Sequence, residues 1–231
     1  GIRPDFKASG NIRYAHRSRP SCEIYFISNR TSSQITDTCF FRDGTAHAEA
    51  WDALDGRSKI INKLYYAADS TFIPVKLKPY QSLFIVFSDR PQKGNNKPVS
   101  YLNTDEKDLV MNIEGKWLVE FDTTWGGPSK IEFSELTDWT ERPEEGIRYY
   151  SGVARYSTTF ELPGTERITD NIEYYLNLGK VKNIAKVWLN GIEVGVAWTE
   201  PWEISLNDAI NNGKNNLVIE VANLWINRLI G

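Results

Sequence analysis

The sequence predicts an all-β protein that consists of two tandem β-sandwiches. Strand-like segments recur along the whole chain with turn signals between them, and helical periodicity is almost absent. A polar segment rich in proline, glycine and asparagine, at 88–100, separates a first set of short strands from a second set of longer ones. The 231 residues are enough for two ordinary domains. We therefore place the first sandwich at 1–95 and the second at 96–231.

The first half contains seven short segments with the alternation and the β-branched and aromatic content of strands. Turn signals such as Asp43-Gly44 and Pro79-Tyr80 separate them. Seven short strands are typical of an immunoglobulin-like sandwich. The predicted strands are 12–16, 23–27, 35–41, 47–51, 59–66, 71–77 and 82–87.

The two cysteines are too few for a disulfide scaffold or a zinc site. A four-residue turn at 29–32 predicts that the strands on either side of it form a hairpin. The same register places Cys22 opposite Cys39, on the apolar face of both strands. Two interpretations remain open: a pair of small buried hydrophobic side chains, or a cross-strand disulfide in a periplasmic or secreted protein.

The second half has longer strands and one strong hairpin signal. Asn190-Gly191 stands between two short apolar segments and predicts a two-residue type I′ turn. A short helix is expected at 206–211, ended by Gly213. The number of strands is that of a jelly roll. The predicted strands are 115–122, 149–162, 171–178, 185–190, 193–198 and 216–222.

Composition excludes several classes of protein. The charged and hydrophobic fractions, 25% and 41%, are those of a globular protein, and no apolar stretch reaches the roughly 18 residues of a membrane helix. Residues 1–100 carry 15 Lys and Arg against 9 Asp and Glu, whereas residues 101–231 carry 12 against 21. The basic side chains are scattered without a nucleic-acid-binding motif, so no nucleic-acid partner is expected. The opposite charges of the two halves favour two domains that attract one another or face different partners.

Sequence motifs for catalysis or for a nucleotide cofactor are missing. His16 and His47 are the only histidines, and no G-x-S-x-G motif supplies a nucleophile for them, so both are interpreted as surface or rim residues. The sequence has no G-x-G-x-x-G motif and no Walker loop. Glu144-Glu145 stands in a Pro/Gly loop and is interpreted as a solvated acidic turn. We therefore predict no cofactor and no catalytic residue.

Tryptophan is the strongest functional signal, because seven of the eight tryptophans lie in the acidic second half. An indole face can stack on the C–H face of a sugar, and nearby polar side chains bind its hydroxyls; the alternative is that tryptophan fills the core. Trp117 alternates with core residues of one strand and is assigned to the core, and Trp188 is expected to be half exposed. The candidate carbohydrate-binding residues are Trp125, Trp139, Trp198 and Trp225, with Asn227 or Arg228 as hydrogen-bond donors.

Several motifs of the second half resemble, in order and spacing, the sugar-binding jelly roll of family 2 glycoside hydrolases, a galactose-binding-like domain. They are YSGVARY at 150–156, LGKV at 178–181, VWLNG at 187–191, GKNNL at 213–217 and VAN at 221–223. Further motifs resemble the C-terminal part of the large family 106 enzymes, the bacterial α-L-rhamnosidase group: WGGP at 125–128, LTDW at 136–139 and NLWINRLIG at 223–231. Three motifs of the first half, YAHR at 14–17, IYFISN at 24–29 and WD at 51–52, resemble the β-domain that follows the barrel in such enzymes.

The resemblance implies a C-terminal, non-catalytic piece of a periplasmic or secreted bacterial glycoside hydrolase that acts on plant-type polysaccharide. In such enzymes the catalytic carboxylates lie on a (β/α)₈ barrel, and this chain has no run of alternating strands and helices to form one. The expected partners are carbohydrate and the missing barrel, which the chain would support. Jelly rolls of this type often hold a structural Ca²⁺, but no ligand-spaced oxygen cluster stands out. A stand-alone binding or adhesion module and a purely structural spacer remain the alternatives.

Overall fold

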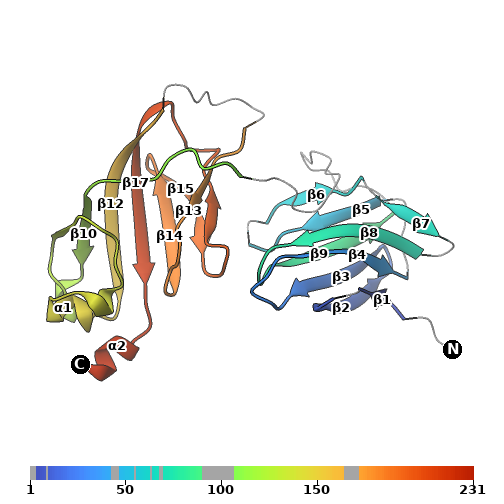
Figure 1. Ribbon diagram of the computed structural model, residues 1–231, viewed down its shortest axis with the longest axis horizontal. Helices are drawn as coiled ribbons and strands as arrows, with labels where there is room; N and C mark the ends of the chain where they lie inside the picture. Colours follow the sequence, from blue (N-terminus) through green and yellow to red (C-terminus); the bar gives the residue numbers. More distant parts are fainter. Residues whose placement is uncertain are drawn as a thin grey trace. The chain divides into compact units, whose positions relative to one another are not determined.

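The computed structural model describes residues 4–8, 10–42, 47–54, 56–62, 64–67, 70–89, 107–163 and 172–231. The chain divides into two compact units, Gly1–Asp108 and Leu109–Gly231, and both consist almost entirely of antiparallel strands (Figure 1). This confirms the predicted all-β fold class. The predicted junction at 95/96 and most of the polar segment 88–100 lie outside the described residues, as does the predicted turn Asp43-Gly44.

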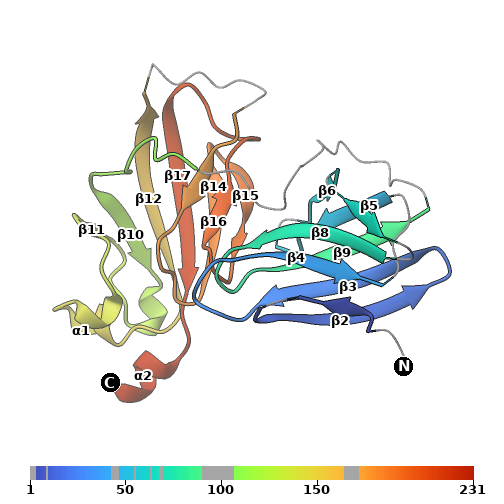
Figure 2. The same ribbon diagram turned by 45° about the vertical axis from the view of Figure 1, so that its right-hand side comes forward.

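The N-terminal unit is a sandwich of two antiparallel sheets (Figure 2). A four-stranded sheet has the order β1-β4-β8-β7 and a five-stranded sheet the order β2-β3-β9-β5-β6. Inward-facing side chains of both sheets form one core, which includes Tyr25, Phe41, Ile73, Ile85 and Phe87. The strands are β1 (Phe6–Lys7), β2 (Ile12–Arg19), β3 (Cys22–Asn29), β4 (Ile35–Phe41), β5 (His47–Trp51), β6 (Ser58–Ile60), β7 (Tyr65–Ala67), β8 (Ser70–Leu77) and β9 (Ser82–Ser88).

The predicted hairpin between β3 and β4 is wrong, because these strands belong to different sheets. β3 pairs with β2 and β9, whereas β4 pairs with β1 and β8. The buried side chain of Asn29 stabilises the connection between the two sheets. Its amide nitrogen donates to the Ser33 and Lys78 carbonyl oxygens at 2.7 and 2.9 Å, and its amide oxygen accepts from the Thr31 N–H at 2.8 Å.

The predicted pairing of Cys22 with Cys39 fails for the same reason. Both cysteines are free thiols, Cys39 in the core and Cys22 partly buried. The predicted strand 59–66 is divided as well, since β6 and β7 lie in different sheets.

The C-terminal unit is built on a six-stranded antiparallel sheet of order β11-β10-β12-β17-β14-β15, with a two-stranded sheet of β13 and β16 (Figure 1). Alternate residues of the long strands face a separate core, which includes Trp117, Phe133, Tyr150, Leu189 and Leu217. The strands are β10 (Trp117–Phe121), β11 (Ile131–Phe133), β12 (Val153–Leu162), β13 (Tyr175–Asn177), β14 (Ile184–Leu189), β15 (Ile192–Ala197), β16 (Glu203–Ser205) and β17 (Gly213–Ala222).

The Asn190-Gly191 hairpin is confirmed. Both residues have positive φ, 53° and 84°, as a type I′ turn requires, and β14 and β15 pair on either side of them. The helix predicted at 206–211 is wrong, and the segment forms a turn between β16 and β17. The buried amide of Asn215 exchanges two hydrogen bonds with the Asn211 backbone, and the Asn190 amide donates to the Ala209 carbonyl at 2.7 Å. These side-chain bonds compete with a helical backbone.

Within the part of the chain that the structure describes, short helices occur only in the C-terminal unit, between its strands and after β17. They are η1 (Thr123–Trp125), η2 (Trp139–Glu141), α1 (Glu145–Arg148) and α2 (Ile226–Ile230). None of the described helices is long and apolar enough to span a membrane.

Candidate functional site

The strand register gathers several segments of the C-terminal unit at one end of its six-stranded sheet. Phe121 at the end of β10 pairs with Ala154, and Val153 at the start of β12 pairs with Ala222 at the end of β17. Ala222 also pairs with Ile184, the first residue of β14. β15 ends beside the start of β14, because its last residue, Ala197, pairs with Ala185. The segments 122–130, 178–183, 198–202 and 223–231, and the part of 134–152 that leads into β12, therefore lie at the same end of the sheet, which we name the loop end.

Three of the four predicted tryptophans are exposed at the loop end. Trp125 follows β10 and is 53% exposed, Trp198 follows β15 and is 58% exposed, and Trp225 follows β17 and is 76% exposed. β10, β17 and β15 are separated from one another by one strand each, so the ends of the strands that precede the three indoles are about 10 Å apart.

The backbone that carries Trp125 is closely held. The Asp122 carboxylate caps η1 by accepting from the Thr124 N–H at 2.8 Å, and Gly126 closes it with a φ of 86°. Gly127 packs against the Tyr150 ring so closely that an added Cβ would lie 2.9 Å from it. A closely held backbone loses little conformational entropy when a ligand binds.

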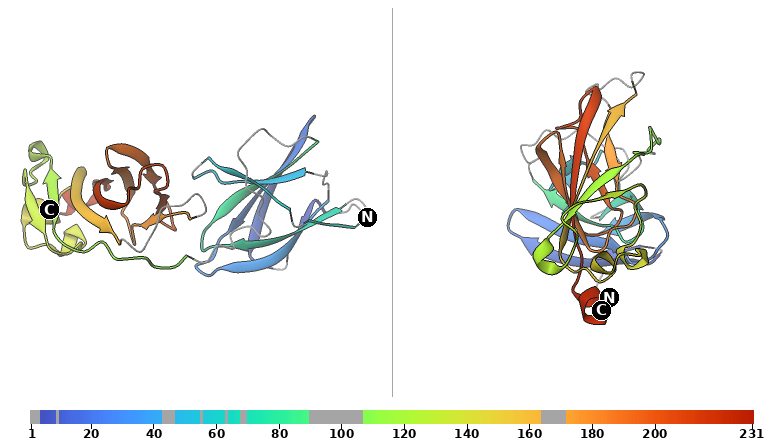
Figure 3. Two further views of the ribbon diagram at one scale, coloured as in Figure 1. Left: turned by 90° about the horizontal axis from the view of Figure 1, so that it is seen from above. Right: turned by 90° about the vertical axis from the view of Figure 1, so that its left-hand side faces the viewer.

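Arg228 is placed beside Trp125 by α2, a hundred residues later in the chain. Its Nη1 donates to the Trp125 carbonyl oxygen at 2.8 Å, and its guanidinium lies 5.4 Å from the centre of the Trp125 ring. α2 is fastened by the Arg228 backbone N–H, which donates to the Ser151 hydroxyl, and by Gly231, which packs on the Tyr149 ring. Figure 3 shows α2 beyond the strand ends of this unit. The exposed Trp125 indole and the Arg228 guanidinium, a cationic hydrogen-bond donor, therefore lie side by side.

α2 presents two different sides to solvent. Trp225 and Arg228, three residues apart, lie on one side of the helix, whereas Ile226, Leu229 and Ile230 form an adjacent apolar side. These three aliphatic side chains are 61–79% exposed. Asn227, the other predicted donor, lies between the two sides and is half-buried.

The structure corrects the placement of Trp139, which was predicted with the stacking residues. Its indole is only 7% exposed, packs edge-on against Phe121 and Tyr150, and donates its N–H to the Tyr156 hydroxyl. Burial on all sides leaves no face for a sugar. η2 begins at Trp139 and turns the side chain inward, which the sequence signal of a tryptophan at a strand end could not reveal. Trp117 is in the core as expected, and Trp188 is half-buried between Arg155 and Lys186.

The carboxylates at the loop end are held in their ionised form. The Thr124 hydroxyl and backbone N–H lower the pKa of Asp122, and the Thr140 backbone N–H and hydroxyl lower the pKa of Asp138. The pKa of Glu144 is lowered first by its own backbone N–H. A glycosidase acid needs the opposite shift, so these groups are suited to accept hydrogen bonds rather than to donate a proton.

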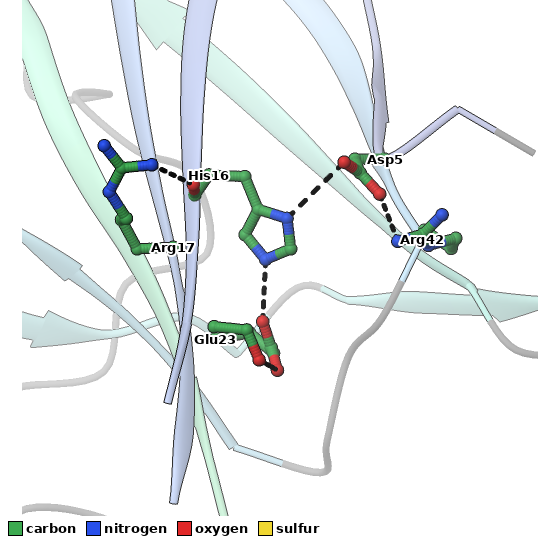
Figure 4. A network of polar contacts seen from close by, with 6 residues as sticks. Asp5, His16, Arg17, Glu23 and Arg42 are labelled. Atoms are coloured by element: carbon green, nitrogen blue, oxygen red, sulfur yellow. Dashed lines mark hydrogen bonds and ion pairs between the residues drawn. The ribbon is translucent and has the colours of Figure 1, made fainter. Parts of the chain in front are cut away.

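The predicted rim histidine His16 belongs to a polar network in the N-terminal unit (Figure 4). Its Nε2 lies 2.7 Å from a Glu23 oxygen and its Nδ1 3.7 Å from Asp5, which also pairs with Arg42. Asp5 and Arg42 flank strands of one sheet, whereas His16 and Glu23 lie in the other, so the network joins the two layers.

The same network does not have the geometry of a hydrolase triad. The Ser18 hydroxyl donates to Glu23 at 2.6 Å instead of to the imidazole, so it lacks the serine–histidine bond of such a site. Among the described residues, no group of three or more histidine, cysteine, aspartate or glutamate side chains could hold a metal ion.

Comparisons with known proteins connect the chain with glycoside hydrolases. A putative β-glucuronidase of Formosa agariphila is 40% identical over 142 residues, which are 58% of this chain and 12% of that protein. The structure of a rhamnosidase from Novosphingobium sp. PP1Y matches 99% of this chain with a TM-score of 0.86 and 30% identity, and the match covers 21% of that chain. No protein-family model matches.

The chain thus spans 12% and 21% of these two longer proteins. The match to the rhamnosidase extends over both units, as the motifs at 14–29 and at 125–231 predicted. The resemblance seen in the sequence is confirmed: the chain consists of β-domains of the kind associated with glycoside hydrolases.

Proposed function

We propose that this chain is a non-catalytic β-module of a glycoside hydrolase and that its C-terminal unit binds carbohydrate at the loop end. The observation that carries the proposal is the exposed Trp125 indole with Arg228 fixed beside it. The indole stacks on the C–H face of a pyranose, and the remaining guanidinium N–H groups donate to its hydroxyl oxygens.

Trp225 and Trp198 extend the same surface. Both indoles are more exposed than Trp125, and each follows a strand that ends at the loop end. A row of separated aromatic faces suits an extended polysaccharide better than a single sugar. The site is open, so each contact contributes little and the affinity for one short oligosaccharide is weak.

The apolar side of α2 is proposed to pack against the catalytic domain of the same enzyme. Ile226, Leu229 and Ile230 form a contiguous exposed apolar surface, which is unusual for a residue cluster that faces only water. In the rhamnosidase that matches the whole chain, the matched region is accompanied by nearly four-fifths of a longer polypeptide. An enzyme with this module acts on polysaccharide outside the cytoplasm, in the periplasm or beyond, because such substrates are too large to enter.

Calorimetric titration of the 231-residue chain with a panel of neutral and acidic oligosaccharides tests the binding site. Trp125→Ala is expected to weaken binding about tenfold, as loss of a central stacking residue does, and Arg228→Gln to weaken it less. Trp188→Ala removes an indole away from the loop end and serves as the matched control. Equal affinity for Trp125→Ala and the unchanged chain contradicts the proposed site.

The non-catalytic role has a separate test. The purified chain is expected to leave aryl α-L-rhamnosides, aryl β-galactosides and pectic oligosaccharides intact. Hydrolysis that disappears when one carboxylate of this chain is replaced by its amide overturns the proposal.

A further inference from the structure

The five-stranded sheet of the N-terminal unit has an apolar row on its outer face. Direct strand pairing puts Ala15, Phe26, Phe84 and Trp51 side by side on β2, β3, β9 and β5. Their neighbours along each strand, such as Ile27 and Ile85, face the core, so this row faces away from it. Its members are partly buried or exposed, and none belongs to the core cluster of the unit.

Three aromatic rings of this row form a continuous surface. The Phe26 and Phe84 ring centres are 5.2 Å apart, and Trp51 lies directly opposite Phe84 on the next strand. The Trp51 N–H donates to Glu49 at 2.8 Å, which fixes the indole against the sheet. From Phe26 to Trp51 the surface crosses two strand spacings, or about 10 Å.

A cavity of about 350 Å³ opens at the Trp51 end of the row. It is lined by Trp51, Asp52, Ala53, Gly56, Ser58 and Phe84. The lining residues include two aromatic residues, an aspartate and a serine, and the Asp52 carboxylate accepts a hydrogen bond from the Leu54 N–H at 2.9 Å. A carboxylate has acceptor sites for several donors, so Asp52 can also accept from sugar hydroxyls. A pyranose presents this same combination of an apolar face and a hydroxyl rim.

The opposite end of the row carries three arginines. Arg13, Arg17 and Arg19 alternate along the edge strand β2 on the same face as Ala15, and all three are exposed. Figure 4 shows the Arg17 side chain on the opposite side of the strand from the His16 imidazole, which faces the layer interface. A guanidinium can bind a carboxylate or a sulfate through two parallel hydrogen bonds.

We propose that this face of the N-terminal unit is a second carbohydrate-binding surface, which takes an oligosaccharide that carries carboxylate or sulfate groups. One sugar ring occupies the cavity against Trp51, the next rings lie on Phe84 and Phe26, and an anionic group of the chain pairs with the arginines of β2. The surface is independent of the loop end, because its residues belong to the other unit.

Calorimetric titration of the Trp125→Ala chain tests this surface without a contribution from Trp125. The probes are an oligogalacturonate, a sulfated oligosaccharide and a neutral oligosaccharide of the same length. We expect the anionic probes to bind, and their affinity to fall as salt is added. The carboxylated and sulfated probes together show which anionic group the arginines prefer.

Substitutions on this face should then remove binding selectively. Trp51→Ala is expected to weaken it about tenfold, and Arg13→Gln with Arg17→Gln to abolish the preference for the anionic probes and their salt dependence. Ala53→Gln extends a long, uncharged side chain over the exposed rim of the cavity and removes no packed side chain, so it tests the site even if Trp51→Ala unfolds. Tyr65→Ala, an exposed aromatic of the other sheet, is the matched control.

Absence of binding by any anionic probe, or equal affinity of the unchanged chain and of the Ala53→Gln variant for these probes, overturns the proposal. Equal affinity for the neutral and anionic probes overturns the role of the arginines. Neither result bears on the loop end, which is tested in the chain with Trp125 present.

Discussion

Trp139 and Tyr156 share a hydrogen bond within the core of the C-terminal unit. Burial is the main cause that raises the pKa of the Tyr156 hydroxyl to about 12, and the Trp139 N–H acts weakly in the opposite direction. Tyr156→Phe leaves the buried indole N–H without this acceptor, so we expect the free energy of unfolding to fall by about 1–3 kcal/mol. Urea unfolding measures the change, with Tyr14→Phe at an exposed position as the control. Equal losses for both variants contradict the assignment.

Cys39 is predicted to be chemically inert in the folded chain. Burial, and secondarily the charge of Asp37, raise the pKa of its thiol to about 12, and the thiolate is the reactive form. A thiol reagent at pH 8 is therefore expected to modify Cys22, which is partly buried, and to reach Cys39 only after denaturant is added. Rapid modification of both thiols in the native chain, or the absence of free thiol in it, contradicts this structure of the N-terminal unit.

Asp138 gives the C-terminal unit a defined sensitivity to acid. Because its folded pKa is lowered, its contribution to stability is present above the unfolded value near 3.8 and is lost as pH falls through the folded pKa. Asp138→Asn retains an acceptor for the Thr140 N–H but has no charge to titrate. Between pH 4 and pH 2, the melting temperature of the variant is expected to fall less than that of the unchanged chain. The same dependence of melting temperature on pH in both proteins argues against this role of Asp138.

At the scale of elements, α2 contributes a surface more than it contributes stability. Leu229 is 79% exposed and Ile230 74% exposed, so replacing both with lysine should change the free energy of unfolding by no more than about 0.5 kcal/mol. The same change removes most of the apolar side of the helix. Sedimentation at high concentration is expected to show less self-association of the variant, and a large loss of stability instead means that these side chains are packed.

Strand alternation was sufficient to predict most elements, because one face of each long strand is buried. It predicted β4 and β5 to the residue and the type I′ turn at Asn190-Gly191. It did not predict which strands pair: the connection after Asn29 crosses between sheets, and this depends on bonds from its amide to residues nearly fifty positions away. The turn at 206–210 was missed for a similar reason, since side chains of Asn190 and Asn215 hold its backbone.

The candidate site was also predictable only in part, because contacts between distant residues have no local sequence signal. The pattern of tryptophan in a loop beside polar donors indicated Trp125, Trp198 and Trp225, which are exposed. The same pattern also indicated Trp139, whose side chain is buried in the core at the start of η2. The contact of Arg228 with Trp125 joins residues a hundred positions apart and has no local signal. The outer row of Phe26, Phe84 and Trp51 exists only through strand pairing, so no sequence motif could show it.

At the scale of the whole molecule, each unit has its own core, and we propose a separate carbohydrate-binding surface on each. The N-terminal unit, within the basic part of the sequence, presents arginines beside an aromatic row. The C-terminal unit, in the acidic part, presents separated indoles at the loop end.

The central claim, that the loop end binds carbohydrate through exposed indoles, is tested most directly by the indole N–H signals of the eight tryptophans in nitrogen-15 NMR spectra. On titration with a rhamnose-containing oligosaccharide, the signals of Trp125, Trp198 and Trp225 are expected to shift together, with one dissociation constant. The signals of Trp117 and Trp139, which lie in the core, should stay in place. Shifts confined to other indoles, or no shift at millimolar oligosaccharide, contradict the account.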